Sequence, residues 1–312
     1  MRDILVRPKS PLRSLLHLVQ ASRRAAWKYH DRTARRLLVS GGRIQFLDAT
    51  LVFPDGLGLI YSTPLFWNGP DAYEADTSHL VASLLGRVDS FIDVGSNIGI
   101  YAVYAGVRFP NLSVCAFEPI PEIWRKNVDF HRANNLPADR VFNLACSDSD
   151  KTQRIFLPQP DHALEEEQTA TLRPDSWQAS SSNPRCIDVK CITLDSFFST
   201  RGWPAGACLL KIDVEDFEAA VLRGAQTLVS KCRPWILCEI LPRGHHNRDT
   251  LALIADLKYV LFAVTPEGLF RMTGADFSRP REFKDFLLLP AGKISSEVFY
   301  MPIELLKNAS LC

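Results

Sequence analysis

The stretch Phe91-Ile-Asp-Val-Gly-Ser-Asn-Ile-Gly99, read with Phe117-Glu-Pro119, decides the fold of this chain. Apolar residues end a buried parallel strand, a glycine turn follows, and a helix opens at the turn. Gly95 and Gly99 allow the backbone to turn sharply and to approach a ligand. Glu118 ends the next strand, where a carboxylate can accept hydrogen bonds from ribose hydroxyls. The pattern therefore predicts a Rossmann-like crevice for a nucleoside.

The first acid of this stretch distinguishes between the ligands that such a crevice can hold. The pattern is Asp-x-Gly-x-Asn-x-Gly rather than Gly-x-Gly-x-x-Gly. Asp93 would repel a phosphate and would favour a cation such as the amino group of a methionine moiety. S-adenosylmethionine therefore fits better than a dinucleotide, which weakens the alternative of a nucleotide-binding oxidoreductase. A strand, turn and helix with two glycines also occur without any ligand, so the motif alone leaves that reading open.

A second apolar strand ends in acids within the stretch from Leu209 to Gly224. It places Lys211, Asp213 and Glu215 near the carboxyl edge of the sheet, which is the side on which open α/β folds bind ligands. The acids Asp216 and Glu218 come next and suit the positive end of a helix dipole.

Six segments of the chain, in order, resemble the FkbM-type family of S-adenosylmethionine-dependent methyltransferases. They are Asp-Val-Gly-Ser-Asn-Ile-Gly (93–99), Phe-Glu-Pro (117–119), Ile-Thr-Leu-Asp (192–195), Lys-Ile-Asp-Val-Glu (211–215), Val-Leu-Arg-Gly-Ala (221–225) and Ile-Leu-Cys-Glu (236–239). The resemblance covers residues 70–290. Asp216 stands where the family usually has glycine.

The resemblance implies a class I methyltransferase, an α/β fold with a seven-stranded, mostly parallel sheet that has one antiparallel pair and is flanked by helices. It also implies transfer of a methyl group to a hydroxyl oxygen of a sugar, glycan or natural product. Because Asp216 adds a charge beside the expected site, a non-catalytic module that binds S-adenosylmethionine or a partner remains an alternative.

The expected cofactor site draws on the glycine turn, the two strand ends and two further acids. Glu74 precedes a helix at a place where, in the resembled family, an acid lies over the cofactor. Asp148 follows the expected third strand, Val141–Cys146, where an adenine amino group could be bound. The cofactor candidates are Glu74, Asp93, Gly95, Ser96, Asn97, Gly99, Glu118, Pro119, Asp148 and Lys211.

Methyl transfer to an alcohol is helped by a base that removes the hydroxyl proton. The catalytic candidates are Asp213, Glu215, Glu239, His245 and His246. Asp213 and Glu215 rank first, Glu239 ends a later strand, and the two histidines follow it on a loop where they could equally be surface residues. Carboxylates would also suit Mg²⁺ bound to a vicinal diol, but no metal-ligand spacing supports a metal site.

The organisation along the chain has three expected parts. Residues 1–43 form a basic helical extension, residues 44–70 a β-hairpin lead-in broken at Pro54-Asp-Gly56, and residues 71–312 the methyltransferase domain. Within the domain, the Pro-, Ser- and Glu-rich stretch 158–186 is expected to be a loop insertion that shapes the acceptor pocket or is simply disordered.

The net charge is +1, but residues 1–43 are strongly basic. Apolar residues between Leu15 and Val19 are flanked by arginines, so this segment could lie on an anionic membrane, bind a partner helix or pack on the protein's own core. It is too short to span a bilayer and lacks a secretory cleavage pattern, whereas an Arg-rich transit peptide stays an alternative. Nucleic acid is not the expected partner, although the basic segment keeps RNA methylation as an alternative.

The eight cysteines form no C-x-x-C pair and several lie in apolar strands, which predicts free thiols in a reducing cytosol. A cytoplasmic protein, with peripheral membrane contact as an option, is therefore expected.

Overall fold

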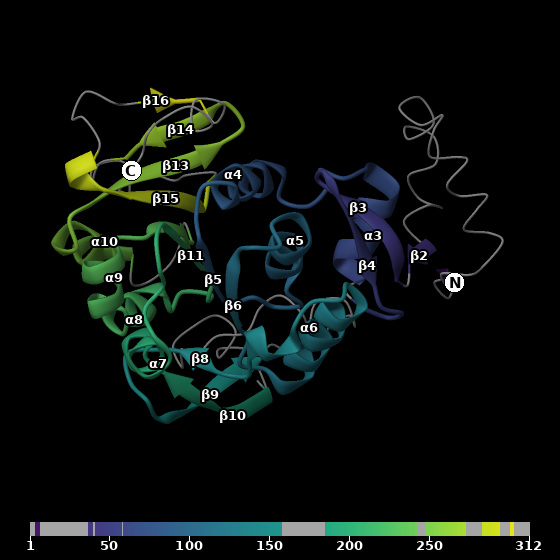
Figure 1. Cartoon of the computed structure of the whole chain (residues 1–312), viewed down its shortest axis with the longest axis horizontal. Helices are drawn as coiled ribbons and strands as arrows, with labels where there is room; N and C mark the ends of the chain where they lie inside the picture. The colour runs from purple at the N-terminus through teal and green to yellow at the C-terminus, as the bar shows by residue number, and fades with distance from the viewer. Residues whose placement is uncertain are drawn as a thin grey trace.

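The computed structural model describes residues 4–6, 37–39, 41–57, 59–157, 185–241, 247–272, 283–293 and 300–302. Its central feature is a nine-stranded sheet with helices on both faces (Figure 1). The strand order is β16-β14-β13-β15-β12-β11-β5-β6-β7. The strands are β5 (Ser90–Val94), β6 (Ser113–Phe117), β7 (Val141–Phe142), β11 (Cys208–Ile212), β12 (Trp235–Glu239), β13 (Tyr259–Thr265), β14 (Gly268–Arg271), β15 (Asp285–Pro290) and β16 (Tyr300–Met301).

Strands β7, β6, β5, β11 and β12 run parallel, as the apolar runs predict. Successive side chains of a strand point to opposite faces, so Phe91 and Ile92 enter two different hydrophobic clusters. Both faces of the sheet are thus covered, which is why these strands read as nearly continuous apolar sequence. Their carboxyl ends meet at one edge of the sheet.

The other half of the sheet is antiparallel and larger than expected. β15 lies antiparallel between β12 and β13, and β14 and β16 then extend the edge with two more antiparallel pairings. The prediction of seven strands was therefore wrong, because the sheet of the described residues has nine. The prediction of one antiparallel pair was also wrong, because these strands form four antiparallel pairs. A two-residue turn at Pro266 and Glu267 folds β14 back onto β13, with Thr265 opposite Gly268; such short strands leave little pattern in the sequence.

Helices cover the sheet on both sides (Figure 1). One side carries α4 (Ala75–Leu85), α5 (Ile100–Arg108) and α6 (Pro121–Ala133), and the other carries α7 (Leu194–Arg201), α8 (Glu218–Arg223), α9 (Gln226–Cys232) and α10 (Asn247–Asp256). Two short 3₁₀ turns are η1 (Ala138–Arg140) and η3 (Ala291–Lys293). The fold is the three-layered, Rossmann-like arrangement that the sequence predicts.

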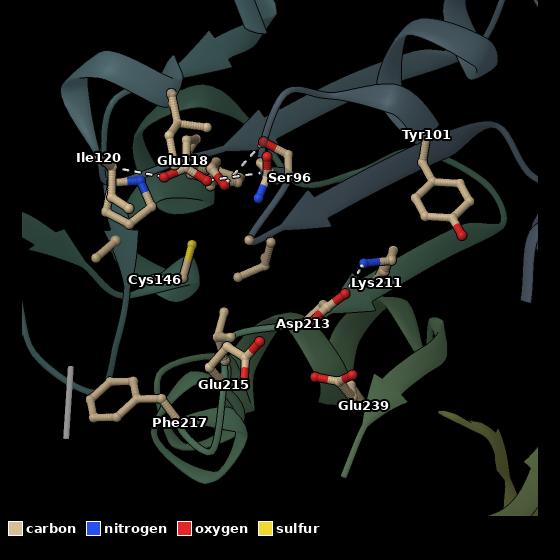
Figure 2. A pocket seen from close by; sticks show the side chains of 18 of the residues that line it. Ser96, Tyr101, Glu118, Ile120, Cys146, Lys211, Asp213, Glu215, Phe217 and Glu239 are labelled. Atoms are coloured by element: carbon tan, nitrogen blue, oxygen red, sulfur yellow. Dashed lines mark hydrogen bonds and ion pairs between the residues drawn. The ribbon is translucent and has the colours of Figure 1, made fainter. Parts of the chain in front are cut away.

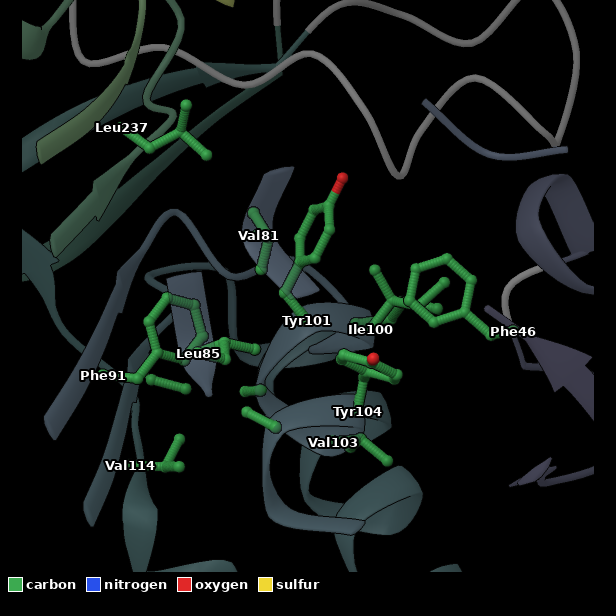
Figure 3. Close-up of a cluster of buried hydrophobic side chains, with 14 of the residues drawn as sticks. Phe46, Val81, Leu85, Phe91, Ile100, Tyr101, Val103, Tyr104, Val114 and Leu237 are labelled. Atoms are coloured by element: carbon green, nitrogen blue, oxygen red, sulfur yellow. The ribbon is translucent and has the colours of Figure 1, made fainter. Parts of the chain in front are cut away.

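The lead-in is a hairpin of β3 (Gly42–Phe46) and β4 (Ala49–Phe53), followed by a helix, α3 (Leu59–Asn68). Its turn lies at Leu47 and Asp48, not at Pro54-Asp-Gly56, because Phe46 pairs with Ala49 and Leu47 takes the left-handed conformation. The turn at Pro54-Asp-Gly56 instead follows the hairpin and precedes α3. Phe46 packs edge-on against Tyr101 and Tyr104 of α5, which attaches the hairpin to the domain (Figure 3).

The expected third strand, Val141–Cys146, is broken in two. β7 ends at Phe142, and β8 (Ala145–Cys146) joins a separate three-stranded sheet with β10 (Arg185–Ile192) and β9 (Thr152–Leu157). Asn143 lies at the break, and its side-chain amide donates to the carbonyls of Glu118 and Pro119. These bonds hold the chain at the end of β6 while it passes to the second sheet. Most of the expected insertion at 158–186 lies outside the described residues.

Of the basic segment 1–43, the structure describes two short parallel strands, β1 (Ile4–Val6) and β2 (Leu37–Val39), and the start of β3. The helix expected near Leu15–Val19 lies outside the described residues. No helix within the described ranges is both long enough and apolar enough to cross a membrane.

Candidate functional site

A cavity of about 330 Å³ opens at the carboxyl ends of the parallel strands. Its wall is formed by the loop after β5, the ends of β6, β11 and β12, and the start of α4. Figure 2 shows Ser96 and Glu118 together, with Lys211, Asp213, Glu215 and Glu239 grouped apart from them. The strand ends that the sequence singles out therefore meet around one space.

The glycine turn is shaped by close contact with its neighbours. Gly95 has a φ of 77°, and a Cβ atom there would lie 1.8 Å from the carbonyl oxygen of Asp213. Any side chain at this position would push apart the loops after β5 and β11. Asn97 also takes a left-handed conformation, with a φ of 52°, and Gly99 follows with a φ of 86°. Gly99 lies against the side chain of Asn127 and does not line the cavity, whereas Ser96 and Asn97 do.

Glu118 lies buried at the cavity wall, beside Pro119. One carboxylate oxygen accepts the backbone N–H of Asn97 at 3.0 Å and the other accepts that of Ile120 at 2.8 Å. Burial raises the pKa of Glu118 to about 7, against the effect of these two hydrogen bonds. Each oxygen keeps a further lone pair, so the carboxylate can still accept hydrogen bonds from a ligand hydroxyl.

Asp93 lies behind the cavity wall and is only 1% exposed. Neither of its carboxylate oxygens has a hydrogen-bond partner among the described residues. Burial raises its pKa to about 6, although the charge of Lys211 opposes this rise. A buried carboxylate without partners is costly, and a cation near it would offset that cost.

Lys211 and Asp213 form an ion pair at the end of β11. The Lys211 ammonium lies 2.8 Å from an Asp213 oxygen and 5.3 Å from the centre of the Tyr101 ring. Burial acts to raise the pKa of Asp213, but the charge and hydrogen bond of Lys211 outweigh it and hold the pKa below its usual value. Asp213 is thus an ionised acid that is already bound to a cation.

A second basic residue, Lys284, bridges two acids from different elements. It contacts Glu239 at the end of β12 and lies 3.7 Å from a carboxylate oxygen of Glu74 at the start of α4. The other oxygen of Glu74 accepts the Tyr101 hydroxyl at 2.9 Å. Burial and the charge of Asp213 raise the pKa of Glu239 well above its usual value, while Lys284 opposes this.

Glu215 is the third carboxyl group at this edge of the sheet. Its backbone is left-handed, with a φ of 52°, and its side chain lines the cavity. Burial, and then the charge of Asp213, raise its pKa to about 7. Glu74, Asn97 and Glu215 are three of the eight non-glycine residues with positive φ in the described part of the chain, and these three line the cavity. Backbone strain of this kind is common at functional sites.

The remaining expected site residues lie elsewhere. Asp148 does not line the cavity, although Leu144, Ala145 and Cys146 just before it do; it forms an ion pair with Arg223 at 3.3 Å. His245 and His246 lie outside the described residues. The described ranges contain no group of three His, Cys, Asp or Glu side chains able to hold a metal ion.

Tyr101 and Lys284 belong to the site but were not expected from the sequence. Lys284 directly precedes β15, and an antiparallel strand brings its first residue to the edge where its parallel neighbours end. Recognising β15 as antiparallel could therefore have indicated Lys284. Tyr101 lies in the first turn of the helix that follows the glycine turn.

Two of the six matching segments have structural rather than cavity contacts. The carboxylate of Asp195 accepts the backbone N–H groups of Thr227 and Leu228, each at 2.8 Å, and so caps the start of α9. Gly224 lies against the carbonyl of Ser147, where a Cβ atom would come within 1.9 Å. Segments 192–195 and 221–225 therefore hold helices beside the site.

The chain is similar in sequence to known methyltransferases. Over 160 residues the chain is 31% identical to the 31-O-demethyl-FK506 methyltransferase FkbM of Streptomyces tacrolimicus, and the match covers 44% of this chain and 60% of that protein. Over 148 residues it is 28% identical to Methyltransferase 1 of Beauveria bassiana, with coverages of 44% and 58%. The chain thus spans about three fifths of the length of either relative.

Among solved structures, the methyltransferase FkbM of Methylobacillus flagellatus superposes with a TM-score of 0.34 and 14% identity, over 64% of this chain and 43% of the other. A family model described as the methyltransferase FkbM domain matches residues 93–261, more than half of the 312 residues of this chain. The chain belongs to the FkbM methyltransferase family.

Proposed function

We propose that this protein is an S-adenosylmethionine-dependent O-methyltransferase that methylates a hydroxyl group of a sugar, glycan or natural product. The observation that carries the proposal is one cavity with a ribose-type acid, Glu118, on one part of its wall and a group of carboxyls, Asp213, Glu215 and Glu239, on another. The name of the Streptomyces relative, which specifies an O-demethyl substrate, supports oxygen as the acceptor atom.

The residues present fit this cofactor. Glu118 would accept hydrogen bonds from the ribose hydroxyls, and the turn of Gly95, Ser96 and Asn97 would lie against the nucleoside. Asp93, a buried carboxylate without partners in the described part of the chain, would be stabilised by the positive charge of the cofactor. Glu74 would add a further acid to the same wall.

The cofactor, when bound, supplies an electrophilic methyl group. The protein must then hold an acceptor hydroxyl in line with it and take up the hydroxyl proton. Glu215 suits this second task best, since its pKa of about 7 lies near neutral pH. Asp213 is a weaker base, because Lys211 holds its pKa below the usual value, whereas the pKa of Glu239 is raised well above its usual value.

The cofactor is tested by calorimetric titration with S-adenosylmethionine and S-adenosylhomocysteine, with NADH as the control. We expect binding of the two adenosyl compounds only. Glu118→Ala should weaken that binding at least about tenfold, because it removes charge-assisted hydrogen bonds to ribose. Binding of NADH alone, or no binding of any of the three, would contradict the proposal.

The base is tested once an acceptor has been found by screening hydroxylated compounds. Glu215→Gln should lower kcat by about 10²- to 10⁴-fold and leave the affinity for S-adenosylhomocysteine unchanged. In the wild type, kcat/KM should rise with pH through about 7, because the base must lose its proton. Normal transfer by Glu215→Gln would remove Glu215 from the catalytic role.

A further inference from the structure

Asn127 lies behind the cavity and connects helix α6 to the glycine turn. It lies on the buried face of α6 and is fully buried, with an exposed fraction of 0%. Its side-chain amide donates to the Ser96 hydroxyl at 3.0 Å and to the Asn97 carbonyl at 2.8 Å. A single side chain on a helix thus reaches two successive residues of the glycine turn.

The side-chain oxygen of Asn127 points at the end of the same turn. A Cβ atom on Gly99 would lie 2.2 Å from this oxygen, so the amide fills the space that a side chain at position 99 would need. The oxygen has no hydrogen-bond partner among the described residues, and an unsatisfied buried acceptor destabilises a fold. The side-chain nitrogen, rather than the oxygen, therefore connects Asn127 to the turn through its two hydrogen bonds.

The hydrogen bonds continue from Asn127 to the expected ribose acid. Asn127 binds the carbonyl of Asn97, and the backbone N–H of Asn97 donates to Glu118 at 3.0 Å. Ser96, which accepts from Asn127, donates its hydroxyl to the carbonyl of Phe117, next to Glu118. The left-handed backbone of Asn97 would be strained without such support.

We propose that Asn127 is a positioning residue for cofactor binding, which holds Ser96 and Asn97 so that Glu118 faces the ribose. This inference rests on the proposed cofactor. Asn127 does not line the cavity, and so it acts through the turn rather than by touching a ligand.

Asn134, at the end of the same helix, provides a matched control. Its amide group donates to the carbonyls of Val52 and Phe130, and its oxygen accepts the N–H of Val52. Replacing it by alanine removes three side-chain hydrogen bonds, against two for Asn127, but two of the three join α6 to strand β4 and the third lies within α6, so none reaches the glycine turn.

The experiment compares Asn127→Ala with Asn134→Ala by calorimetric titration of the full chain with S-adenosylhomocysteine, well below the melting temperature of each variant. Both substitutions should lower the melting temperature. Only Asn127→Ala should weaken binding, by about tenfold or more, whereas Asn134→Ala should stay within about twofold of the wild type. The double variant Asn127→Ala/Glu118→Gln should lose less binding free energy than the sum of the losses of the two single variants, because both substitutions weaken the same contact, that of Glu118 with the ribose.

Wild-type affinity in Asn127→Ala, equal losses in both alanine variants, or full additivity with Glu118→Gln would overturn the inference. Should Asn127→Ala not fold, Asn127→Asp keeps the size of the side chain and removes the donor to Asn97, and it must show the same loss. A wild type that does not bind S-adenosylhomocysteine would instead refute the proposed cofactor, so the two failures are distinguishable.

Discussion

At the scale of single residues, the backbone after β11 is strained at two consecutive positions. Glu215 and Asp216 are consecutive residues with φ angles of 52° and 70°, in the left-handed region that favours glycine. Asp216 stands where the resembled family has glycine, and its conformation gives the physical reason for that preference. The aspartate also adds a negative charge that raises the pKa of both Glu215 and Glu218.

Replacing Asp216 by glycine should therefore stabilise the fold by about 0.5–1 kcal/mol, because relief of the left-handed strain exceeds the entropic cost of glycine. Asp216→Asn is the control, since asparagine tolerates this conformation and removes only the charge. Urea denaturation of the three proteins at neutral pH separates the two effects. A glycine variant that is less stable than the wild type would mean that the contacts of Asp216 stabilise the fold by more than its left-handed backbone destabilises it.

At the scale of elements, the helices behind the site are fixed by short polar contacts rather than by apolar packing alone. Thr193 caps α7 by accepting the N–H of Ser196, and two residues later Asp195 caps α9. The N–H of Asp195 also donates to the carbonyl of Gly224, between α8 and α9. The segment 192–195 thus joins three helices at the ends where their backbone groups lack intrahelical partners.

Asp195→Ala should lower the free energy of unfolding by about 1–2 kcal/mol, because it leaves two backbone N–H groups at the start of α9 without their acceptor. Asp195→Asn keeps one acceptor oxygen and should lose less. Thermal and urea unfolding measure the loss, and titration with S-adenosylhomocysteine should show unchanged affinity. A variant of normal stability that fails to bind would place Asp195 in the site instead of behind it.

At the scale of the whole molecule, the sequence predicted those parts that depend on local pattern. The strand 90–94, the glycine turn and Glu118 lie as expected, because buried parallel strands and left-handed turns restrict the residues they accept. The hairpin turn, the break after Phe142 and the strands β14 and β16 were not predicted. The break depends on contacts of Asn143 with the end of β6, which is distant in the sequence, and β14 and β16 are too short to leave a clear pattern. Lys284 was also missed, because only the sheet topology brings it to Glu239.

Because several buried acids have raised pKa values, we expect the stability of the folded protein to depend on pH. Burial raises the pKa of Glu118 and Glu215 to about 7 and that of Glu218 to about 8. In the unfolded chain these groups lose their protons near pH 4.3. Between pH 7 and 8.5 the folded state therefore binds more protons than the unfolded state, and its stability falls as pH rises. His131, whose pKa burial lowers to about 4, acts in the opposite direction, but chiefly below its unfolded pKa of about 6.5.

Differential scanning fluorimetry of the ligand-free protein should accordingly show a melting temperature that decreases steadily from pH 7 to pH 8.5. Glu218→Gln isolates one contribution, because Glu218 does not line the cavity and glutamine can still accept the N–H of Asp216 that Glu218 binds at 3.2 Å. The variant should gain stability relative to the wild type as pH rises, since the neutral amide avoids the cost of a buried charge. A constant difference between the two proteins across this range would show that Glu218 does not titrate there, and a melting temperature that rises with pH would contradict the raised pKa values of the acids as a group.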